Sequence, residues 1–261
     1  MIRFFFIFCT FSFTTCLAHL DLPASLTYEK AAESNTHYDD FIPIKNSGDE
    51  PLNVKITHVD YLYNSQGETH FAELGTNARS NAAWMKLSHH FMTIPPHETT
   101  RLHFNVTIPD NRQLQGTYWS MFLIEPVVPP ADIPEAKNSV GLQTVVRYGV
   151  QVITNVGEKG ICSLKILNKN ITRNESGQLF LLDVENSGSS LLEPGVSIDI
   201  FDQSGKLAGH FVGRKCRILP SCSIRYDIDI TIIPAGKYKA VVILDGEEKG
   251  VFGAQYDLNI S

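Results

Sequence analysis

The chain contains Ile94-Pro95-Pro96-His97-Glu98-Thr99-Thr100-Arg101-Leu102-His103-Phe104-Asn105-Val106-Thr107-Ile108-Pro109, which leads to Gly116-Thr117-Tyr118. A second stretch follows the same plan: Ile218-Leu219-Pro220-Ser221-Cys222-Ser223-Ile224-Arg225-Tyr226-Asp227-Ile228-Asp229-Ile230, then Ile233-Pro234-Ala235 and Gly236-Lys237-Tyr238. Each stretch has a proline turn, an alternating strand, another proline turn and Gly-x-Tyr. Proline fixes φ at the turn, and alternation places one face of the strand on a core. The shared plan predicts two copies of one β-sandwich unit.

A shorter match precedes each stretch. Ile44-Lys45-Asn46-Ser47-Gly48 corresponds to Val184-Glu185-Asn186-Ser187-Gly188. Each is followed by a β run, Val54-Lys55-Ile56 or Val196-Ser197-Ile198, and then by a polar turn, Ser65-Gln66-Gly67 or Gln203-Ser204-Gly205. Because the matching pieces keep the same order, the two halves are predicted to be divergent duplicates.

The rest of the sequence also favours β structure. Leu52–Tyr63 alternates over a full strand, 117–124 is dense in aromatic and β-branched residues, and 140–154 is a long extended run. No window holds an apolar stripe at helical spacing. We therefore expect an all-β protein of two tandem immunoglobulin-like β-sandwich domains, covering 19–154 and 161–261, with a linker at 155–160.

The composition limits the classes of partner. The 261 residues are 43% hydrophobic and 19% charged, with a net charge of −6. This composition is typical of a globular protein. The basic residues are scattered singly, so the clustered charge of a nucleic-acid-binding face is absent. We expect no nucleic-acid partner.

Residues 1–18 have the layout of a secretory signal peptide. A basic start at Arg3 is followed by an apolar run from Phe4 to Phe13 and by small residues before Ala18. Cleavage after Ala18 would leave a chain with no membrane insertion, in the periplasm or secreted. The alternatives are an uncleaved anchor, for which the apolar run is short, and a lipid anchor at Cys16.

Export would leave three cysteines, Cys162, Cys216 and Cys222. In an oxidising compartment one disulfide and one free thiol is the simplest arrangement. Cys216 and Cys222 flank Pro220, so they are the first candidates for a local bridge. Cys162 could also pair with either of them.

The first unit resembles the N-terminal domain of the periplasmic pilus-assembly chaperones, which are PapD-like immunoglobulin-fold proteins. The resemblance runs from Ile94 to Val152 and consists of five segments in order: Ile94-Pro95-Pro96; 101–110; Tyr118-Trp119-Ser120-Met121-Phe122; the proline-rich 125–134; and the long run 141–152. It implies that the long run lends alternating side chains to an incomplete sandwich in a pilin-like or surface subunit, by β-strand addition.

The resemblance also implies specific partner-binding residues. The corresponding face of the long run is Leu142, Thr144, Val146, Tyr148 and Val150, or Val145 and its neighbours in a shifted register. The family also anchors the subunit's terminal carboxylate with two basic side chains in the cleft between its domains. The first strand here, at 26–29, carries no arginine, and Arg147 is the nearest basic residue on the long run.

The sequence gives only weak support for metal binding or enzymatic catalysis. His89 and His90 are adjacent and would point to opposite faces of a strand. Asp227 and Asp229 share a strand face, which an ordinary polar face explains. No Gly-x-Ser-x-Gly elbow or phosphate-binding loop is present. We predict a protein-binding module without cofactor, metal or enzymatic activity. The alternative is a cell-surface or periplasmic structural or adhesion module with no chaperone activity.

Overall fold

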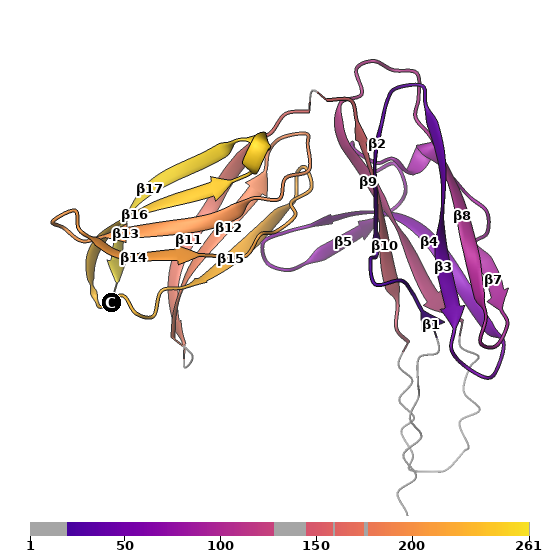
Figure 1. Ribbon diagram of the computed structural model, residues 1–261, viewed down its shortest axis with the longest axis horizontal. Helices are drawn as coiled ribbons and strands as arrows, with labels where there is room; N and C mark the ends of the chain where they lie inside the picture. Colours follow the sequence, from indigo (N-terminus) through magenta and orange to yellow (C-terminus); the bar gives the residue numbers. More distant parts are fainter. Residues whose placement is uncertain (1–19, 128–144, 159, 175–176, 261) are drawn as a thin grey trace, which may run out of the picture.

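The computed structural model describes residues 20–127, 145–158, 160–174 and 177–260. Within them the chain forms two β-sandwiches that meet at one end, as Figure 1 shows. The predicted all-β, two-sandwich fold is confirmed. The proposed signal segment at 1–18 and most of the proline-rich 125–134 lie outside the described residues. No helix among the described residues has both the length and the apolar character needed to cross a bilayer.

The first sandwich packs two sheets face to face. Sheet I has the order β1 (Leu20–Asp21), β3 (His37–Asn46), β8 (Thr99–Thr107) and β6 (Met85–Leu87). Sheet II has the order β2 (Thr27–Ala32), β10 (Tyr148–Val156), β9 (Gly116–Pro126), β4 (Leu52–Tyr63) and β5 (Thr69–Ala72), with β7 (Phe91–Ile94) also paired to β4. A short 3₁₀ turn, η1 (Ala82–Trp84), lies between β5 and β6.

Alternating apolar residues explain this core. On β8, Leu102, Phe104 and Val106 are buried while the residues between them are more exposed. The Phe104 ring meets Phe122 of β9 edge to face, at 5.6 Å between centroids. The strand β9 is buried along both faces, from Gly116 to Ile124. One face of β9 therefore packs on the core, and the other is covered from outside the first sandwich.

The N-terminal strand region divides between the two sheets. β1 pairs antiparallel with β3 in sheet I, and the chain then crosses to sheet II, where β2 pairs parallel with β10. This crossing makes β2 the edge strand of sheet II.

The second sandwich repeats the two-layer arrangement. Sheet III is β11 (Leu164–Asn174), β12 (Gly177–Asn186) and β15 (Ser223–Asp229). Sheet IV has the order β14 (Leu207–Val212), β13 (Gly195–Phe201), β16 (Gly236–Asp245) and β17 (Val251–Ile260), with a 3₁₀ turn, η2 (Glu247–Lys249), before β17. Phe180, Tyr226 and Val242 lie fully buried between the sheets.

The proline turns of the sequence repeat have the same backbone structure in both sandwiches. The N–H of Glu98 donates to the carbonyl of Pro95, and the N–H of Cys222 donates to the carbonyl of Leu219. The third residue of each turn has positive φ, 57° at His97 and 60° at Ser221. Positive φ at this position is the geometry of a type II turn, for which the preceding proline is suited. The duplication read from the sequence is thus present in the backbone.

The expected extended run at 140–154 is shorter in the structure. β10 begins at Tyr148, and residues 145–147 lie outside it. Residues 141–144 are not among the described residues.

Candidate functional site

One edge of β10 is covered over six of its nine residues and is open over the first three. β10 pairs with β9 along its whole length, from Tyr148↔Ile124 to Val156↔Gly116. On its other side it pairs with β2 only from Gln151↔Thr27 to Val156↔Ala32. The edge before Gln151 therefore has no paired strand among the described residues.

The direction of the backbone groups follows from the pairing with β2. The N–H of Gln151 donates to the carbonyl of Leu26 at 2.8 Å, so this residue points its backbone groups toward β2. Because these groups alternate along a strand, Gly149 points toward the same side, where β2 is absent. The open edge can accept main-chain hydrogen bonds from another extended segment.

Exposed apolar side chains gather at the start of this edge. Val145 is 45% exposed, Val146 is 40% exposed, and Val127 at the end of β9 is 40% exposed. Tyr148 is half-buried, and its hydroxyl donates to the carbonyl of Leu20 at 3.2 Å. These residues form the candidate partner-binding edge.

The structure corrects one predicted partner-binding residue. Val150 has 0% exposure and packs in the core of the first sandwich, because it lies where β10 is already sandwiched against sheet I. Its side chain cannot reach a partner. Of the other predicted positions, Val146 is exposed, while Leu142 and Thr144 lie outside the described residues.

Arg147, the proposed cleft anchor, precedes β10 at the end away from the second sandwich. Its Nε donates to Oε2 of Glu125 at 2.5 Å, at the start of β10. The second sandwich meets the opposite end of β10, where Gly116 and Val156 lie (Figure 1). Arg147 and the junction between the sandwiches are therefore separated by the length of β10, which rises by about 3.3 Å per residue.

Two hydrogen bonds at Thr117 join the sandwiches. The N–H of Thr117 donates to the carbonyl of Ser189 at 2.8 Å, and the N–H of Leu191 donates to the Thr117 hydroxyl at 2.7 Å. Gly116 has φ of +87°, and a Cβ there would lie 2.2 Å from the Ser189 oxygen. The glycine of the first Gly-x-Tyr therefore permits the contact between domains.

The long β4 strand extends the contact. The Tyr63 hydroxyl accepts from the N–H of Leu219 at 3.0 Å and donates to the carbonyl of Arg217 at 3.0 Å. Beside it, one apolar cluster joins residues of both sandwiches: Tyr61, Trp119, Met121, Leu123, Ile153, Leu191, Leu219 and Cys222. This cluster covers the outer face of β9 and accounts for its burial on both sides.

Arg217 is a basic residue at this junction that the sequence did not reveal. It forms an ion pair with Glu29 of β2, and the other oxygen of Glu29 accepts from Nδ2 of Asn155 at 2.7 Å. The guanidinium charge is thus compensated within the chain. Only the fold brings Arg217 to β2, since 188 residues separate it from Glu29 in sequence.

The expected disulfide between Cys216 and Cys222 is not formed. All three described cysteines are free thiols. Cys222 is buried in the cluster between the sandwiches, whereas Cys216 packs beside the core of the second sandwich. The side chains of Cys216 and Cys222 therefore pack in different apolar clusters. Burial raises the pKa of Cys222 to about 11, so its thiol stays protonated at neutral pH.

A buried polar network crosses the first sandwich. His58 Nε2 lies 2.7 Å from the Ser120 hydroxyl, which donates to Asn81 Oδ1 at 2.8 Å. Asn81 in turn donates to Thr154, which contacts the Tyr38 hydroxyl at 2.9 Å. Burial lowers the pKa of His58 to about 4. Ser120 is fully buried, so this histidine–serine pair holds strands together and cannot meet a substrate.

The exposed histidines and acidic residues make no metal site among the described residues, where no three candidate ligands lie together. His89, His90 and His103 are exposed, as are Asp227 and Asp229.

No protein-family model and no curated protein sequence matches the chain. Among solved structures, a chain from the chaperone–tip adhesin complex of CFA/I fimbriae superposes with a TM-score of 0.50 at 10% identity, covering 94% of this chain and 100% of that one. The class 5 fimbriae chaperone CfaA gives 0.46 at 13% identity over 90% and 98%. The YadV chaperone gives 0.44 at 14% identity over 92% and 100%. The chain therefore has the two-domain, PapD-like β-sandwich fold found among fimbrial chaperones.

Proposed function

We propose that this chain is an extracytoplasmic, chaperone-like assembly module that binds a protein subunit by strand addition at the open edge of β10. The observation that carries the proposal is the partly covered edge, where β2 pairs only from Gln151 onward. The exposed Val145, Val146 and Val127 at the same place supply apolar surface. An unpaired strand edge beside exposed apolar side chains suits an extended partner segment.

The alternation of β10 assigns roles to the residues of this edge. Val146 lies two and four residues before Tyr148 and Val150, so an extension of β10 to residue 145 on binding would add Val146 to the row that faces the first core. A subunit strand paired to the edge would place its own sandwich against this row, and Val146 would enter the subunit's core. Val145 lies on the opposite face and would stay outside that core. Leu142 and Thr144 extend the same row as Val146 and remain predicted members of it.

The fold likeness supports a pilin-like or surface subunit as the partner, because a solved structure of this fold comes from a chaperone–tip adhesin complex. Function does not follow from fold alone, so the open edge is the stronger support. The sequence of residues 1–18 supports a periplasmic or secreted location. The role is binding without catalysis.

The chain departs from the chaperone pattern in the basic side chains that would hold a subunit's terminal carboxylate, and this affects the proposed mode of binding. β2 carries no arginine, and Arg217 near it is already paired with Glu29. We therefore propose that affinity comes from main-chain pairing and the apolar row, because the basic side chains at β2 among the described residues, Lys30 and Arg217, are already paired with Asp40 and Glu29.

The test is co-expression of the full chain with candidate subunits encoded beside its gene, followed by capture on a tag. Val146→Asp is expected to reduce subunit capture by at least about tenfold, since a carboxylate would be buried in the partner's core. Val212→Asp is the matched control, because it makes the same change at an exposed valine on β14 of the second sandwich, away from β10, and it should retain capture.

Circular dichroism and thermal unfolding of both variants would show that the sandwich is intact. Equal capture by the two variants would overturn strand addition at this edge. Retention of no subunit by the unaltered chain would favour the structural or adhesion role instead.

A further inference from the structure

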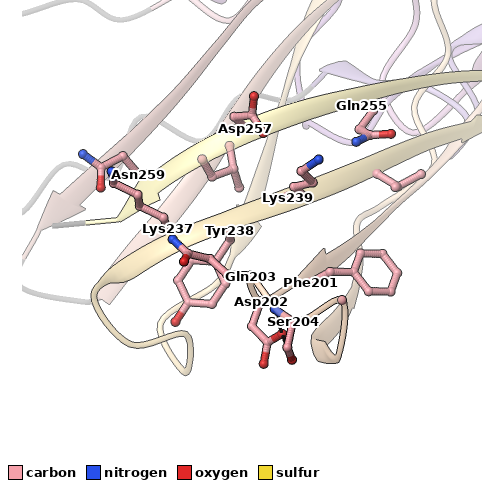
Figure 2. A pocket seen from close by; sticks show the side chains of 13 residues that line it. Phe201, Asp202, Gln203, Ser204, Lys237, Tyr238, Lys239, Gln255, Asp257 and Asn259 are labelled. Carbon is pink, nitrogen blue, oxygen red and sulfur yellow. Dashed lines mark hydrogen bonds between the residues drawn. The ribbon is translucent and has the colours of Figure 1, made fainter.

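A hollow of about 800 Å³ opens on the second sandwich, on a different domain from the β10 edge. Figure 2 shows it between the β13–β14 turn and the ribbon of β16 and β17. Its volume lies within the range of roughly 300–1,000 Å³ that is usual for small-ligand sites.

The strand pairing creates the hollow. β13 pairs with β16 only as far as Phe201↔Lys239, while β17 follows β16 to Gly236↔Ile260. The start of β16 thus lacks a neighbour on the β13 side, and the β13–β14 turn forms a wall there. Asp202 fixes that wall, because its Oδ1 accepts from the N–H groups of Ser204 and Lys206 and from the Ser204 hydroxyl.

Five polar side chains in the hollow have no side-chain partner among the described residues. They are Lys237, Lys239, Gln255, Asp257 and Asn259. Lys239 and Asp257 lie directly opposite each other across β16 and β17, yet they form no ion pair. Nearby charges on the same domain are paired, as in His210–Asp199 and Lys215–Glu247.

The arrangement of these groups is regular. Phe201, Lys239 and Asp257 form one cross-strand row, flanked by Val241 with Gln255 on one side and Lys237 with Asn259 on the other. Figure 2 shows Phe201 and Gln255 toward one end and Lys237 and Asn259 toward the other. Three rows at two residues per step span roughly 13 Å, a length that suits a short oligomer.

The chemistry of the lining favours a sugar. The C–H face of a pyranose can pack on the Phe201 ring. The amides of Gln255 and Asn259 can donate to and accept from sugar hydroxyl groups, and the carboxylate of Asp257 can accept from them. The two ammonium groups, on the same strand face, suit a carboxylate on the ligand. Asp257 between them disfavours a nucleic-acid backbone, which needs uniformly positive surface.

We propose that this hollow binds an acidic oligosaccharide, with a sugar ring on Phe201 and its carboxylate beside Lys237 and Lys239.

The test uses the full chain and isothermal titration with three probes: a tetrasaccharide of polymannuronate, cellotetraose and tetraglutamate. The polymannuronate tetrasaccharide is expected to bind at least about tenfold more tightly than either other probe. Lys239→Met should raise its Kd by about tenfold and Phe201→Ala by about fivefold. Lys165→Met changes an exposed lysine on β11 and should leave the Kd unchanged.

Gln255→Leu provides a second variant on an exposed position, in case Phe201→Ala disturbs folding, and it too should weaken binding. Binding of tetraglutamate as tight as that of the acidic sugar would show a simple cationic patch and overturn the proposal. Equal binding of cellotetraose would overturn the role of the lysines. Absence of binding by all three probes would also overturn it. Subunit capture at β10 is measured separately, so failure of either proposal is distinguishable.

Discussion

Asn46 and Asn186 make the same three side-chain hydrogen bonds in the two sandwiches. Nδ2 of Asn46 donates to the carbonyls of Glu50 and Ile94, and its Oδ1 accepts from the N–H of Gly48. Nδ2 of Asn186 donates to the carbonyls of Ser190 and Ile218, and its Oδ1 accepts from the N–H of Gly188. Each fully buried asparagine thus ties the Asn-Ser-Gly turn to the strand that enters the proline turn.

Replacing one of these asparagines should destabilise its own sandwich. Asn186→Ala leaves the carbonyl of Ile218 buried with one partner fewer and releases the turn at Gly188. We expect a loss of about 2–4 kcal/mol in the free energy of unfolding. Urea unfolding measures it, with Asn168→Ala on the exposed face of β11 as the control. A loss equal to that of the control would contradict the role assigned to the turn.

The contact between the sandwiches can be tested at Gly116. Gly116→Ala would place a Cβ 2.2 Å from the Ser189 oxygen. We expect the sandwiches to separate at this point, with a larger radius of gyration in small-angle X-ray scattering. Gly67→Ala is the matched control, because Gly67 has a similar φ of +83° but nothing within 4 Å of the added Cβ. If both variants expand equally, backbone strain and not the Ser189 contact is responsible.

The stability of the first sandwich should depend on pH through His58. Burial is the main cause that lowers its pKa to about 4, with Asp60 opposing and His90 adding to the effect. The unfolded pKa is about 6.5, so the neutral form is favoured by folding. Stability is then complete above about pH 6.5 and declines as the pH falls from there toward 4, by on the order of 3 kcal/mol.

Urea unfolding at pH about 7.5 and about 4.5 would reveal this dependence. His58→Gln should show less of it, whereas His89→Gln, at an exposed position, should retain it in full. An unchanged pH profile in His58→Gln would show that other groups cause the decline.

The thiols should differ in reactivity. Cys222 is buried and its pKa is raised to about 11, and the thiolate is the reactive form. We expect iodoacetamide to label Cys222 far more slowly than the half-buried Cys162 in the folded protein, and at a similar rate in denaturant. An intact mass without reductant that lacks two hydrogens would instead indicate a disulfide.

The repeat was predictable because its signals are local. Proline, glycine and buried asparagine act within a few residues, so Pro96 with His97 and Pro220 with Ser221 specify the same turn in both halves. The bounds of β4 at Leu52 and Tyr63 were likewise set by alternation and by flanking turn residues.

The site depended on pairing between distant segments, which no local pattern encodes. Sequence alternation gave Val146 and Val150 the same face but could not show that sheet I covers this face at Val150 and not at Val146, which leaves Val146 exposed and Val150 buried. Arg147 looked like a cleft residue only because the sequence does not state which end of β10 meets the second sandwich. Cys216 and Cys222 are close in the chain, yet the turn between them sends their side chains into different clusters.

The uncovered start of β10 exposes the protein to unwanted strand pairing when no partner is bound. A strand edge with exposed valines beside it is a template for pairing with any extended chain, including another copy of the same protein. The length of β2 therefore governs solubility as well as recognition, since each further residue of β2 paired to β10 would shield the edge and shorten the region open to a partner.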